Sequence, residues 1–363
     1  MRWKEWLKNG SGINNPDNCP FIFQPEAEKM EKYDVIIYGC GVMGRKTAQA
    51  LLKKESLEVV GALDIDPELV GKDLGEVLDN PEKLGIVIEK DPVALFSRVK
   101  AHAVVLTTSS HLEKVAPQVR QCLEAGLNVV STCEELSFPW KRHPGLTREL
   151  DEMAKKNGVT VVGTGINPGF LMDVLPLVLT APCLKVSSVK VIRMMNSAKR
   201  RVPFQKKVGT GLTQDEFHEK IENKVITGHV GLLESINMIA AGLGWKLDEA
   251  VELPPEPVID DKEIKTALGK VKPGNVIGLT SIAFGKVRGK EVITLEFCAN
   301  AAVDEEYDEI IIRGEPNLHQ KIIGGIHGDT GTVAVTVNTI PRAVEAPPGV
   351  IVMKDLPPPI AAL

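Results

Sequence analysis

The sequence lacks several patterns that mark particular classes of protein. Its 363 residues include six cysteines that lie far apart and form no C-x-x-C pair, which argues against a disulfide framework and favours a reducing compartment. No apolar run approaches the ~18 residues that a bilayer-spanning helix needs. The net charge is -5, and the charged residues (25%) are mixed in sign, so no basic tract marks a nucleic-acid surface. These absences predict a cytoplasmic protein whose partner is neither a membrane nor a nucleic acid.

Signatures of metal and hydrolase chemistry are absent as well. The chain has no H-E-x-x-H motif, cysteine cluster or carboxylate pattern typical of a metal site, so we expect no bound metal. It has no G-x-S-x-G motif of the kind that exposes a hydrolase serine. Residues 1–29 form an N-terminal extension without the apolar core of a secretory signal. Its aromatic side chains either dock onto a folded subunit or belong to a flexible leader.

A glycine-rich turn follows this extension. Residues 34–44 read DVIIYGCGVMG, a short apolar strand that meets Gly39, Gly41 and Gly44 before a helical pattern begins. In this pattern the first glycine makes the tight turn, the second lets the backbone approach a pyrophosphate, and the third lets helix and strand pack closely. A second apolar strand ends at Asp64, whose carboxylate can hydrogen-bond a ribose 2′-hydroxyl. The order of strand, turn, helix, strand and acid predicts a dinucleotide site.

The acid at the end of the second strand also bears on the choice of cofactor. Asp64 favours NAD because its carboxylate repels a 2′-phosphate, but Arg45 and Lys72 can offset that repulsion, so NAD and NADP both stay open. Asp66 before Pro67 is typical of a helix N-cap. Together with a loop after the fourth strand, the predicted cofactor-binding residues are Gly39, Gly41, Val42, Met43, Gly44, Asp64, Thr107, Thr108 and Ser109.

Strand and helix patterns alternate up to residue 163. The strands are expected at 35–38, 57–63, 86–88, 103–106, 128–131 and 160–163, with helices between them. Units of this length predict an α/β fold with a doubly wound, parallel Rossmann sheet.

The predicted secondary-structure pattern changes after residue 166. Half-alternating, β-branched segments predict a mixed or antiparallel sheet in a second, α+β domain, with strands at 185–197, 276–287, 291–301 and 308–313. Residues 331–339 read as a helix that returns to the first domain. We therefore assign 30–165 plus 328–363 to the dinucleotide-binding domain and 166–327 to the second domain.

Three polar segments are expected at one edge of the parallel sheet, where ligands bind open α/β folds. They are residues 107–111, 131–135 and 163–170, and the second contains the adjacent acids Glu134 and Glu135. If the reaction is oxidation of an amine, a carboxylate base has a clear task. Bringing an alkylamine of pKa near 10.4 to its neutral form at pH 7 requires roughly 4.6 kcal/mol. Alternatively, the two glutamates are a solvated pair that closes the strand.

Further residues are candidates for binding a substrate. Asn167, beside Ile166 in the third segment, is a candidate catalytic and substrate-orienting group, although N-P-G is also a plain turn. His229 is a candidate for the same pocket, or it is structural. Arg200 and Arg201 can hold a substrate carboxylate, or they belong to a solvated charge run that continues to Lys207.

These segments together resemble the 2,4-diaminopentanoate dehydrogenase family, which groups with dihydrodipicolinate-reductase-like oxidoreductases and includes amine dehydrogenases. The resemblance runs from about residue 30 to the C-terminus and leaves out the extension. Its motifs are STCEELSFPW (131–140), GTGINPGF (163–170), RVPFQKKVG (201–209), HVGLLES (229–235), GDTGT (328–332) and NTIP (338–341).

The resemblance implies an activity and an assembly. It implies NAD(P)-dependent oxidative deamination of the C4 amine of 2,4-diaminopentanoate, giving 2-amino-4-oxopentanoate and ammonia, within amino-acid degradation through ornithine. It implies a homodimer built through the sheet of the second domain, and a catalytic glutamate near the nicotinamide that maps to Glu134, with Glu135 as the fallback. The alternatives are a dehydrogenase of simple amines, an imine reductase of the dihydrodipicolinate type, and a non-catalytic protein that senses NAD.

Overall fold

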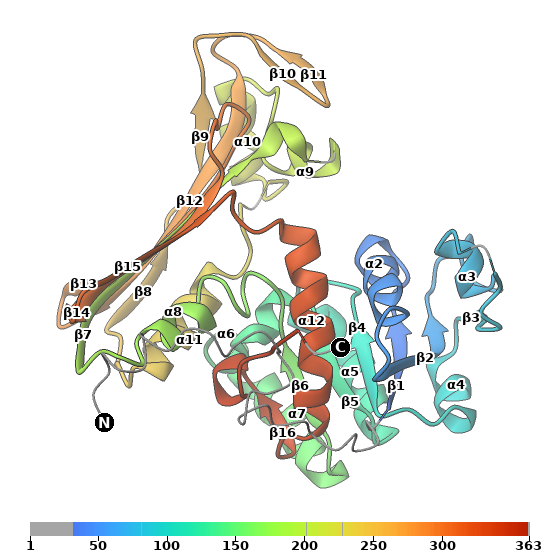
Figure 1. Cartoon of the computed structure of the whole chain (residues 1–363). Helices are drawn as coiled ribbons and strands as arrows, with labels where there is room; N and C mark the ends of the chain where they lie inside the picture. The colour runs from blue at the N-terminus through green and yellow to red at the C-terminus, as the bar shows by residue number, and fades with distance from the viewer. Residues whose placement is uncertain (1–31, 81, 201, 227, 362–363) are drawn as a thin grey trace, which may run out of the picture. The chain divides into compact units, whose positions relative to one another are not determined.

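The computed structural model describes residues 32–80, 82–200, 202–226 and 228–361. The predicted extension (1–29) and Arg201 lie outside these residues. Within them, the chain forms two sheets of seven strands each and a separate small hairpin of β10 (Ile264–Thr266) and β11 (Gly269–Val271). Figure 1 shows the two sheets with helices around them.

The first sheet is parallel throughout, and its strand order is β16-β6-β5-β4-β1-β2-β3. Its central strands are apolar and almost fully buried, as expected when both faces are covered by helices. The strands are β1 (Tyr33–Tyr38), β2 (Leu57–Leu63), β3 (Ile88–Glu89), β4 (Ala103–Leu106), β5 (Asn128–Ser131), β6 (Thr160–Gly163) and β16 (Gly349–Ile351). The doubly wound parallel sheet predicted from the sequence is confirmed.

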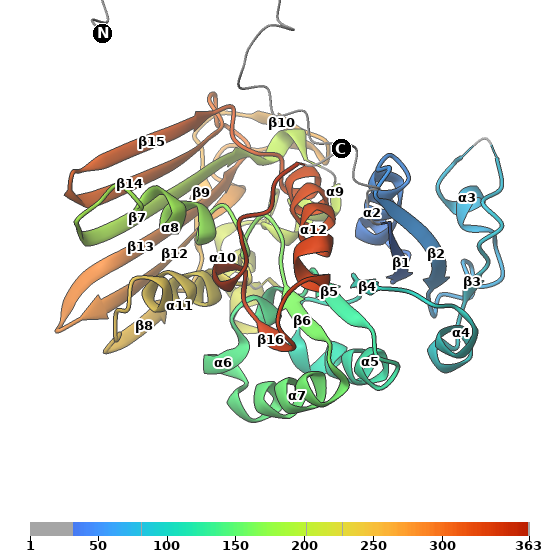
Figure 2. The ribbon, with the colours of Figure 1, turned by 60° about the horizontal axis from the view of Figure 1, so that its bottom comes forward.

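Helices cover both faces of this sheet (Figure 2). On one face, α2 (Val42–Leu51) and α12 (Gly328–Val344) pack against residues such as Val35 and Val105. On the other face lie α4 (Pro92–Arg98), α5 (Leu112–Glu124) and α7 (Pro144–Asn157). The local signals for these helices act as expected: the Asp91 side chain accepts the N–H groups of Val93 and Ala94 at the start of α4, and the left-handed Gly158 ends α7.

The prediction that Asp66 begins a helix is wrong. The Asp66 side chain does accept the N–H of Glu68, but the segment forms a single turn. Gly71, with a φ of +88°, then turns its N–H towards the carbonyl of Ile88 beside the sheet edge. The next helix, α3 (Leu74–Val77), begins instead at Asp73, which caps it. A pairing with a distant strand therefore overrides the local helix-start signal.

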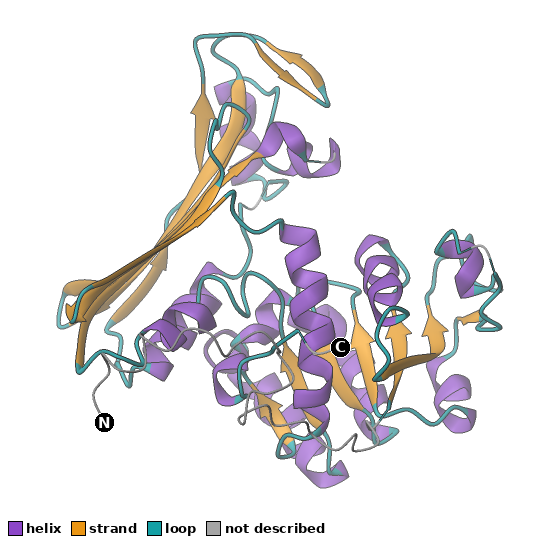
Figure 3. Ribbon diagram, in the orientation of Figure 1, coloured by secondary structure: helices purple, strands orange, loops and turns teal. Residues whose placement is uncertain are grey.

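The second sheet is mixed. Its strand order is β15-β14-β7-β13-β12-β8, with β9 also paired to β12; β7 and β13 are parallel, and the other pairs are antiparallel. The strands are β7 (Lys185–Asn196), β8 (Glu249–Glu252), β9 (Glu256–Ile259), β12 (Val276–Val287), β13 (Lys290–Asn300), β14 (Tyr307–Glu315) and β15 (Leu318–Ile323). The mixed sheet expected for the second part of the chain is confirmed (Figure 3).

Short helices pack against one face of this sheet. The apolar helix α11 (Leu232–Gly242) packs on it with Ile236 and Ile239 in its core. The others are α8 (Val174–Leu179), α9 (Val202–Lys207) and α10 (Gln214–Glu222), the last opened by a capping box of Thr213 and Glu216. No helix in the described ranges is both long and apolar enough to cross a bilayer. The five cysteines in those ranges are free thiols.

Candidate active site

The glycine turn between β1 and α2 has the geometry that a dinucleotide requires. Gly39 has a φ of +101°, which favours glycine, and a Cβ on Gly44 would lie 1.7 Å from the carbonyl oxygen of Gly39. At Gly41, by contrast, a Cβ would have no neighbour within 4 Å. The backbone there faces open space, beside the N-terminus of α2, whose first turn carries no acidic residue. An anion such as a pyrophosphate could therefore approach the N–H groups of Val42 and Met43.

Asp64 lies at the end of β2 against this turn. One carboxylate oxygen accepts the N–H of Cys40 at 2.5 Å, and the other accepts the N–H of Asp66 at 2.9 Å. The side chain is half-buried, and each of its oxygens keeps a second lone pair. Asp64 thus shapes the glycine turn and can still accept a hydrogen bond from a ribose hydroxyl.

The loop after β4 closes the other side of the turn. The Thr107 hydroxyl donates to the carbonyl of Gly39 at 2.8 Å, and the Thr108 hydroxyl donates to Gln118 at 2.6 Å. Ser109 accepts the N–H of His111 at 3.3 Å. The structure therefore brings the predicted cofactor residues of the first and fourth strands together at one edge of the sheet, with Thr107 holding the glycine turn in place.

Glu134 follows β5 and begins a short 3-10 helix, η2 (Glu134–Ser137). Burial raises the pKa of its carboxyl above the usual range, although a hydrogen bond from Ser110 and the charges of Lys207 and His111 oppose the shift. A carboxyl of raised pKa is a better proton acceptor once it is ionised. Glu134 can therefore exchange a proton with a group bound beyond the ends of the strands.

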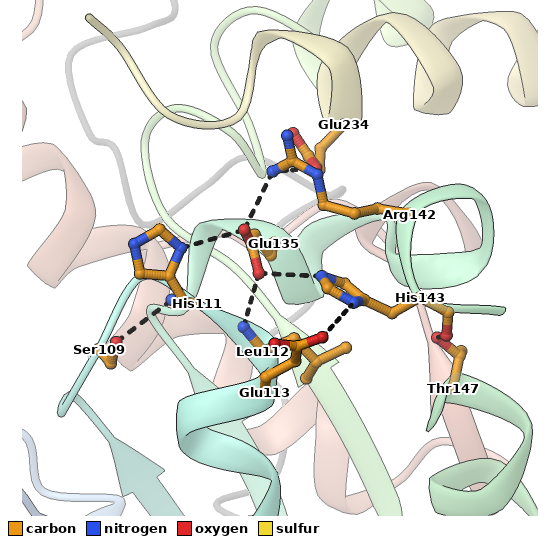
Figure 4. A network of polar contacts seen from close by, with 9 residues as sticks. All are labelled: Ser109, His111, Leu112, Glu113, Glu135, Arg142, His143, Thr147 and Glu234. Carbon is orange, nitrogen blue, oxygen red and sulfur yellow. Dashed lines mark hydrogen bonds and ion pairs between the residues drawn. The ribbon is translucent and has the colours of Figure 1, made fainter. Parts of the chain in front are cut away.

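Glu135 has a different environment, shown in Figure 4. Its side chain is buried and accepts from His111 Nδ1 (3.1 Å), the N–H of Leu112 (2.8 Å), Arg142 Nη1 (3.0 Å) and His143 Nε2 (3.0 Å). Burial alone would raise its pKa, but these donors and the charge of Arg142 hold the pKa of the Glu135 carboxyl below the usual range. Because its oxygens are fully engaged, this carboxylate suits a structural role, and it also caps the N-terminus of α5.

Asn167 and His229 meet although 62 positions separate them in the chain. Asn167 Nδ2 lies 2.5 Å from His229 Nε2, and the imidazole stacks on Phe297 with centroids 4.4 Å apart. Burial, together with the charges of Lys207 and Arg193, lowers the pKa of His229 to about 3, so its ring is neutral. A neutral ring can accept the amide N–H. The buried Oδ1 of Asn167 has no hydrogen-bond partner and can accept from a bound ligand.

The remaining predicted substrate residues lie elsewhere. The Ile166 side chain is in the core against Gly331 of α12, and its N–H donates to Thr332. Arg200 pairs with Glu306 at 2.8 Å, while its buried Nε has no partner. Arg200 also lines a cavity of about 160 Å³ together with Lys46, Lys199 and His327, among others. This arrangement leaves Arg200 only partly available for a ligand carboxylate.

Sequence reasoning missed two features of this region. Lys207, the last residue of α9, is exposed, and its charge acts on both Glu134 and His229. In the sequence it is one cation of a charge run and carries no distinguishing signal. The second feature is the contact of Arg142 with Glu234, a charged residue in the mostly apolar helix α11. An acid in an apolar helix is a signal that could have drawn attention to Glu234.

Comparisons with known proteins agree with this geometry. Residues 170–363 match the model of the 2,4-diaminopentanoate dehydrogenase C-terminal domain, and residues 33–134 match that of the N-terminus of dihydrodipicolinate reductase. The 2,4-diaminopentanoate dehydrogenase of Acetoanaerobium sticklandii is 35% identical over 341 residues, which cover 92% of this chain and 96% of that protein.

Solved structures extend the comparison. An amine dehydrogenase from Mycobacterium smegmatis is 28% identical, with a TM-score of 0.79 and coverage of 91% of this chain and 97% of that chain. A dihydrodipicolinate reductase from Paenisporosarcina sp. TG-14 (15% identity, TM-score 0.51, coverage of 89% and 99%) shares the fold. The resemblance inferred from the motifs is confirmed: this chain is an oxidoreductase and belongs to the 2,4-diaminopentanoate dehydrogenase family.

Proposed function

We propose that this enzyme catalyses the NAD(P)-dependent oxidative deamination of 2,4-diaminopentanoate at C4, as a step of amino-acid degradation in the cytoplasm. The substrate amine, water and the oxidised cofactor give 2-amino-4-oxopentanoate, ammonia, the reduced cofactor and a proton. The similarity to the Acetoanaerobium sticklandii dehydrogenase over nearly the whole chain carries this proposal. With the cofactor's pyrophosphate held at the glycine turn, its nicotinamide would accept the hydride from C4.

Glu134 is the proposed general base. It takes a proton from the substrate ammonium, because only the neutral amine can release hydride from its carbon, and it later activates the water that attacks the imine. Its raised pKa supports this role, since a base works best when its pKa approaches the operating pH. Glu135 is the less favoured candidate because its oxygens already accept four hydrogen bonds.

Asn167 is proposed to orient the reacting amine. His229 holds the amide by accepting from its Nδ2, which leaves the unpartnered Oδ1 to accept an N–H of the substrate. Phe297 supports the imidazole from behind through the stacking contact. Two residues that share one hydrogen bond thus define where the amine nitrogen sits, and the neutral state of His229 avoids repulsion of the incoming ammonium.

Lys207 is the proposed partner of the substrate carboxylate. In 2,4-diaminopentanoate, three carbon–carbon bonds connect C4 to the carboxylate carbon, so the cation must lie near the base, and the charge of Lys207 acts on Glu134. Arg200 is the alternative, supported by its unpartnered Nε at the wall of a cavity. Arg201, the other predicted cation, lies outside the described residues.

The choice between NAD and NADP follows from Asp64. Its carboxylate, already placed against the glycine turn, would repel a 2′-phosphate, so we propose a preference for NAD. The ratio of kcat/KM with the two cofactors measures this preference directly. A higher value with NADP would contradict it and would point to compensation by Arg45 or Lys72.

A substrate panel tests the proposed function. Formation of the reduced cofactor is followed with 2,4-diaminopentanoate, ornithine, lysine and 2-aminopentane, which lacks the carboxylate. We expect the highest kcat/KM with 2,4-diaminopentanoate. A higher value with 2-aminopentane would identify an amine dehydrogenase, and turnover of none of these amines would refute the proposal.

A further inference from the structure

The first turn of α11 places two buried polar residues side by side. Glu234 is 3% exposed and Ser235 is fully buried, in a helix whose other buried residues are apolar or small. Burying a carboxylate costs several kcal/mol unless a partner offsets the cost, and an apolar side chain would stabilise the core at least as well. The contacts that these two residues make therefore need an explanation other than stability.

Glu234 is linked to the segment that carries the proposed base. Its Oε1 lies 3.3 Å from Arg142 Nη1, and the same nitrogen donates to Glu135 Oε1 at 3.0 Å (Figure 4). Arg142 belongs to α6 (Pro139–Arg142), which follows η2 directly. One guanidinium group thus joins two buried carboxylates, one on α11 and one adjacent to Glu134.

Ser235 is linked to the segment that carries Asn167. Its hydroxyl donates to Asp173 Oδ2 at 2.7 Å, and the same oxygen accepts the N–H of Gly169 at 2.8 Å. Asp173 is fully buried, so this contact is shielded from water. The loop that contains Asn167 is therefore attached to the same helical turn as the segment that contains Glu134.

His229 stands three positions before this helix and completes the arrangement. We propose that Glu234 and Ser235 are positioning residues that fix Glu134, Asn167 and His229 relative to one another, through Arg142 with Glu135 and through Asp173. We refer to Glu135, Arg142, Asp173, Glu234 and Ser235 as the α11 brace. The inference rests on the proposed role of Glu134 and adds two residues that affect the reaction only by positioning others.

The variant Glu234→Gln tests the brace because it keeps the shape of the side chain and removes its charge. We expect kcat to fall by about 10- to 100-fold, the scale of loss from a small displacement of a catalytic group, with KM for the cofactor unchanged. A displaced Glu134 would be better hydrated, while Ser110, His111 and Lys207 still face it. Its pKa should then fall, and the acid limb of the kcat–pH profile should move to lower pH.

Three further variants separate positioning from loss of folded protein. Arg142→Lys keeps a cation between the carboxylates and should retain more activity than Arg142→Met, and Ser235→Ala should lower kcat in the same way as Glu234→Gln. Glu149→Gln is the matched control, because Glu149 pairs with Arg120 on the exposed surface of α7. Thermal unfolding reports whether each variant is folded, and a fall in the folded fraction alone would leave the acid limb in place.

The outcomes distinguish this inference from the proposed function. If Glu134→Gln is inactive but folded Glu234→Gln and Ser235→Ala have the wild-type kcat and acid limb, the brace is refuted and the role of Glu134 stands. If Glu134→Gln keeps its turnover, the proposed role of Glu134 fails, whereas the proposed reaction fails only if the wild-type enzyme oxidises none of the amines in the substrate panel. Should Glu234→Gln not fold, an unshifted acid limb and unchanged kcat in Ser235→Ala and Arg142→Met would still overturn the inference.

Discussion

Two neighbouring glutamates differ in chemistry because different groups surround them. Desolvation dominates at Glu134 and raises its pKa, whereas four donors around Glu135 hold its pKa down. Both are candidate bases in the sequence, because nothing in the local sequence distinguishes two adjacent acids that follow a strand. Only the contacts of Glu135 with His111, Arg142 and His143, which lie 24, 7 and 8 positions away, separate a carboxylate that can exchange protons from one that holds structure together.

Replacement of Lys207 tests the proposed carboxylate contact. Lys207→Gln should raise KM for 2,4-diaminopentanoate by roughly 10- to 100-fold, because a charge-assisted hydrogen bond contributes about 1.5–3 kcal/mol. KM for 2-aminopentane should change little, since that amine has no carboxylate. Arg200→Gln serves as the comparison. The same selective loss in Arg200→Gln, with no effect in Lys207→Gln, would transfer the role to Arg200.

The pKa of Glu252 leads to a prediction about how stability depends on pH. Burial, together with the charge of Glu234, raises its pKa from 4.5 to about 7, despite the opposing charge of Arg142. Its ionisation in the folded state therefore lowers the free energy of unfolding as pH rises from about 4.5 to 7. Glu252→Gln should remove this loss and stabilise the protein at pH 8 by at most roughly 3 kcal/mol. Chemical denaturation at pH 5 and pH 8 measures the free energy of unfolding, and the variant Glu256→Gln, at an exposed position, is the control. Equal effects of both variants would contradict the predicted role of Glu252.

At the scale of elements, two glycines of the turn between β1 and α2 are predicted to have different roles, one in packing and one in cofactor binding. Gly44→Ala would force a Cβ to within 1.7 Å of the Gly39 carbonyl oxygen and should lower stability by about 1–3 kcal/mol or more. Gly41→Ala meets nothing within 4 Å and should leave the melting temperature unchanged while weakening cofactor binding, because the methyl group occupies the approach to the backbone. Thermal unfolding and calorimetric titration with NAD measure the two effects. Tight cofactor binding by Gly41→Ala would argue against a pyrophosphate at this turn.

Elements with local signals could be predicted from the sequence. The glycine turn, the Asp91 cap of α4 and the capping box of α10 each depend on a few adjacent residues, and all are formed in the structure. The helix expected at Asp66 is not formed, because the backbone of Gly71 pairs with distant Ile88. The α11 brace could not be predicted for the same physical reason, since its members come from segments up to about a hundred positions apart.

At the scale of the whole molecule, the second sheet has one face covered by α11 and another that carries half-buried apolar side chains. Ile192, Met194, Ile282, Phe284 and Ile311 lie on that second face, as the strand registers and burial pattern indicate. We propose that it is the interface of a homodimer, as the family resemblance implies. The division of the chain into a dinucleotide domain (30–165 plus 328–363) and a second domain (166–327) likewise remains a proposal, supported by the separate cores of the two sheets.

A charge on this face should separate the subunits. Ile192→Glu would place an unpaired carboxylate in the proposed interface and should convert a dimer to a monomer in light scattering coupled to size-exclusion chromatography. Val93→Glu, at an exposed apolar position on α4, is the control and should remain dimeric. A monomeric wild-type protein, or an unchanged mass for Ile192→Glu, would contradict the proposed interface.

The central claim is that Glu134 exchanges the proton of the reacting amine, and Glu134→Gln tests it most directly. Steady-state turnover of 2,4-diaminopentanoate is measured beside NAD affinity determined by titration. We predict that kcat falls by about 10²- to 10⁴-fold, the range that a positioned acid or base contributes. The Kd for NAD should stay within about twofold, because Glu134 follows β5, which β4 separates from β1 and its glycine turn. Turnover at the wild-type rate in a folded Glu134→Gln protein would contradict the account.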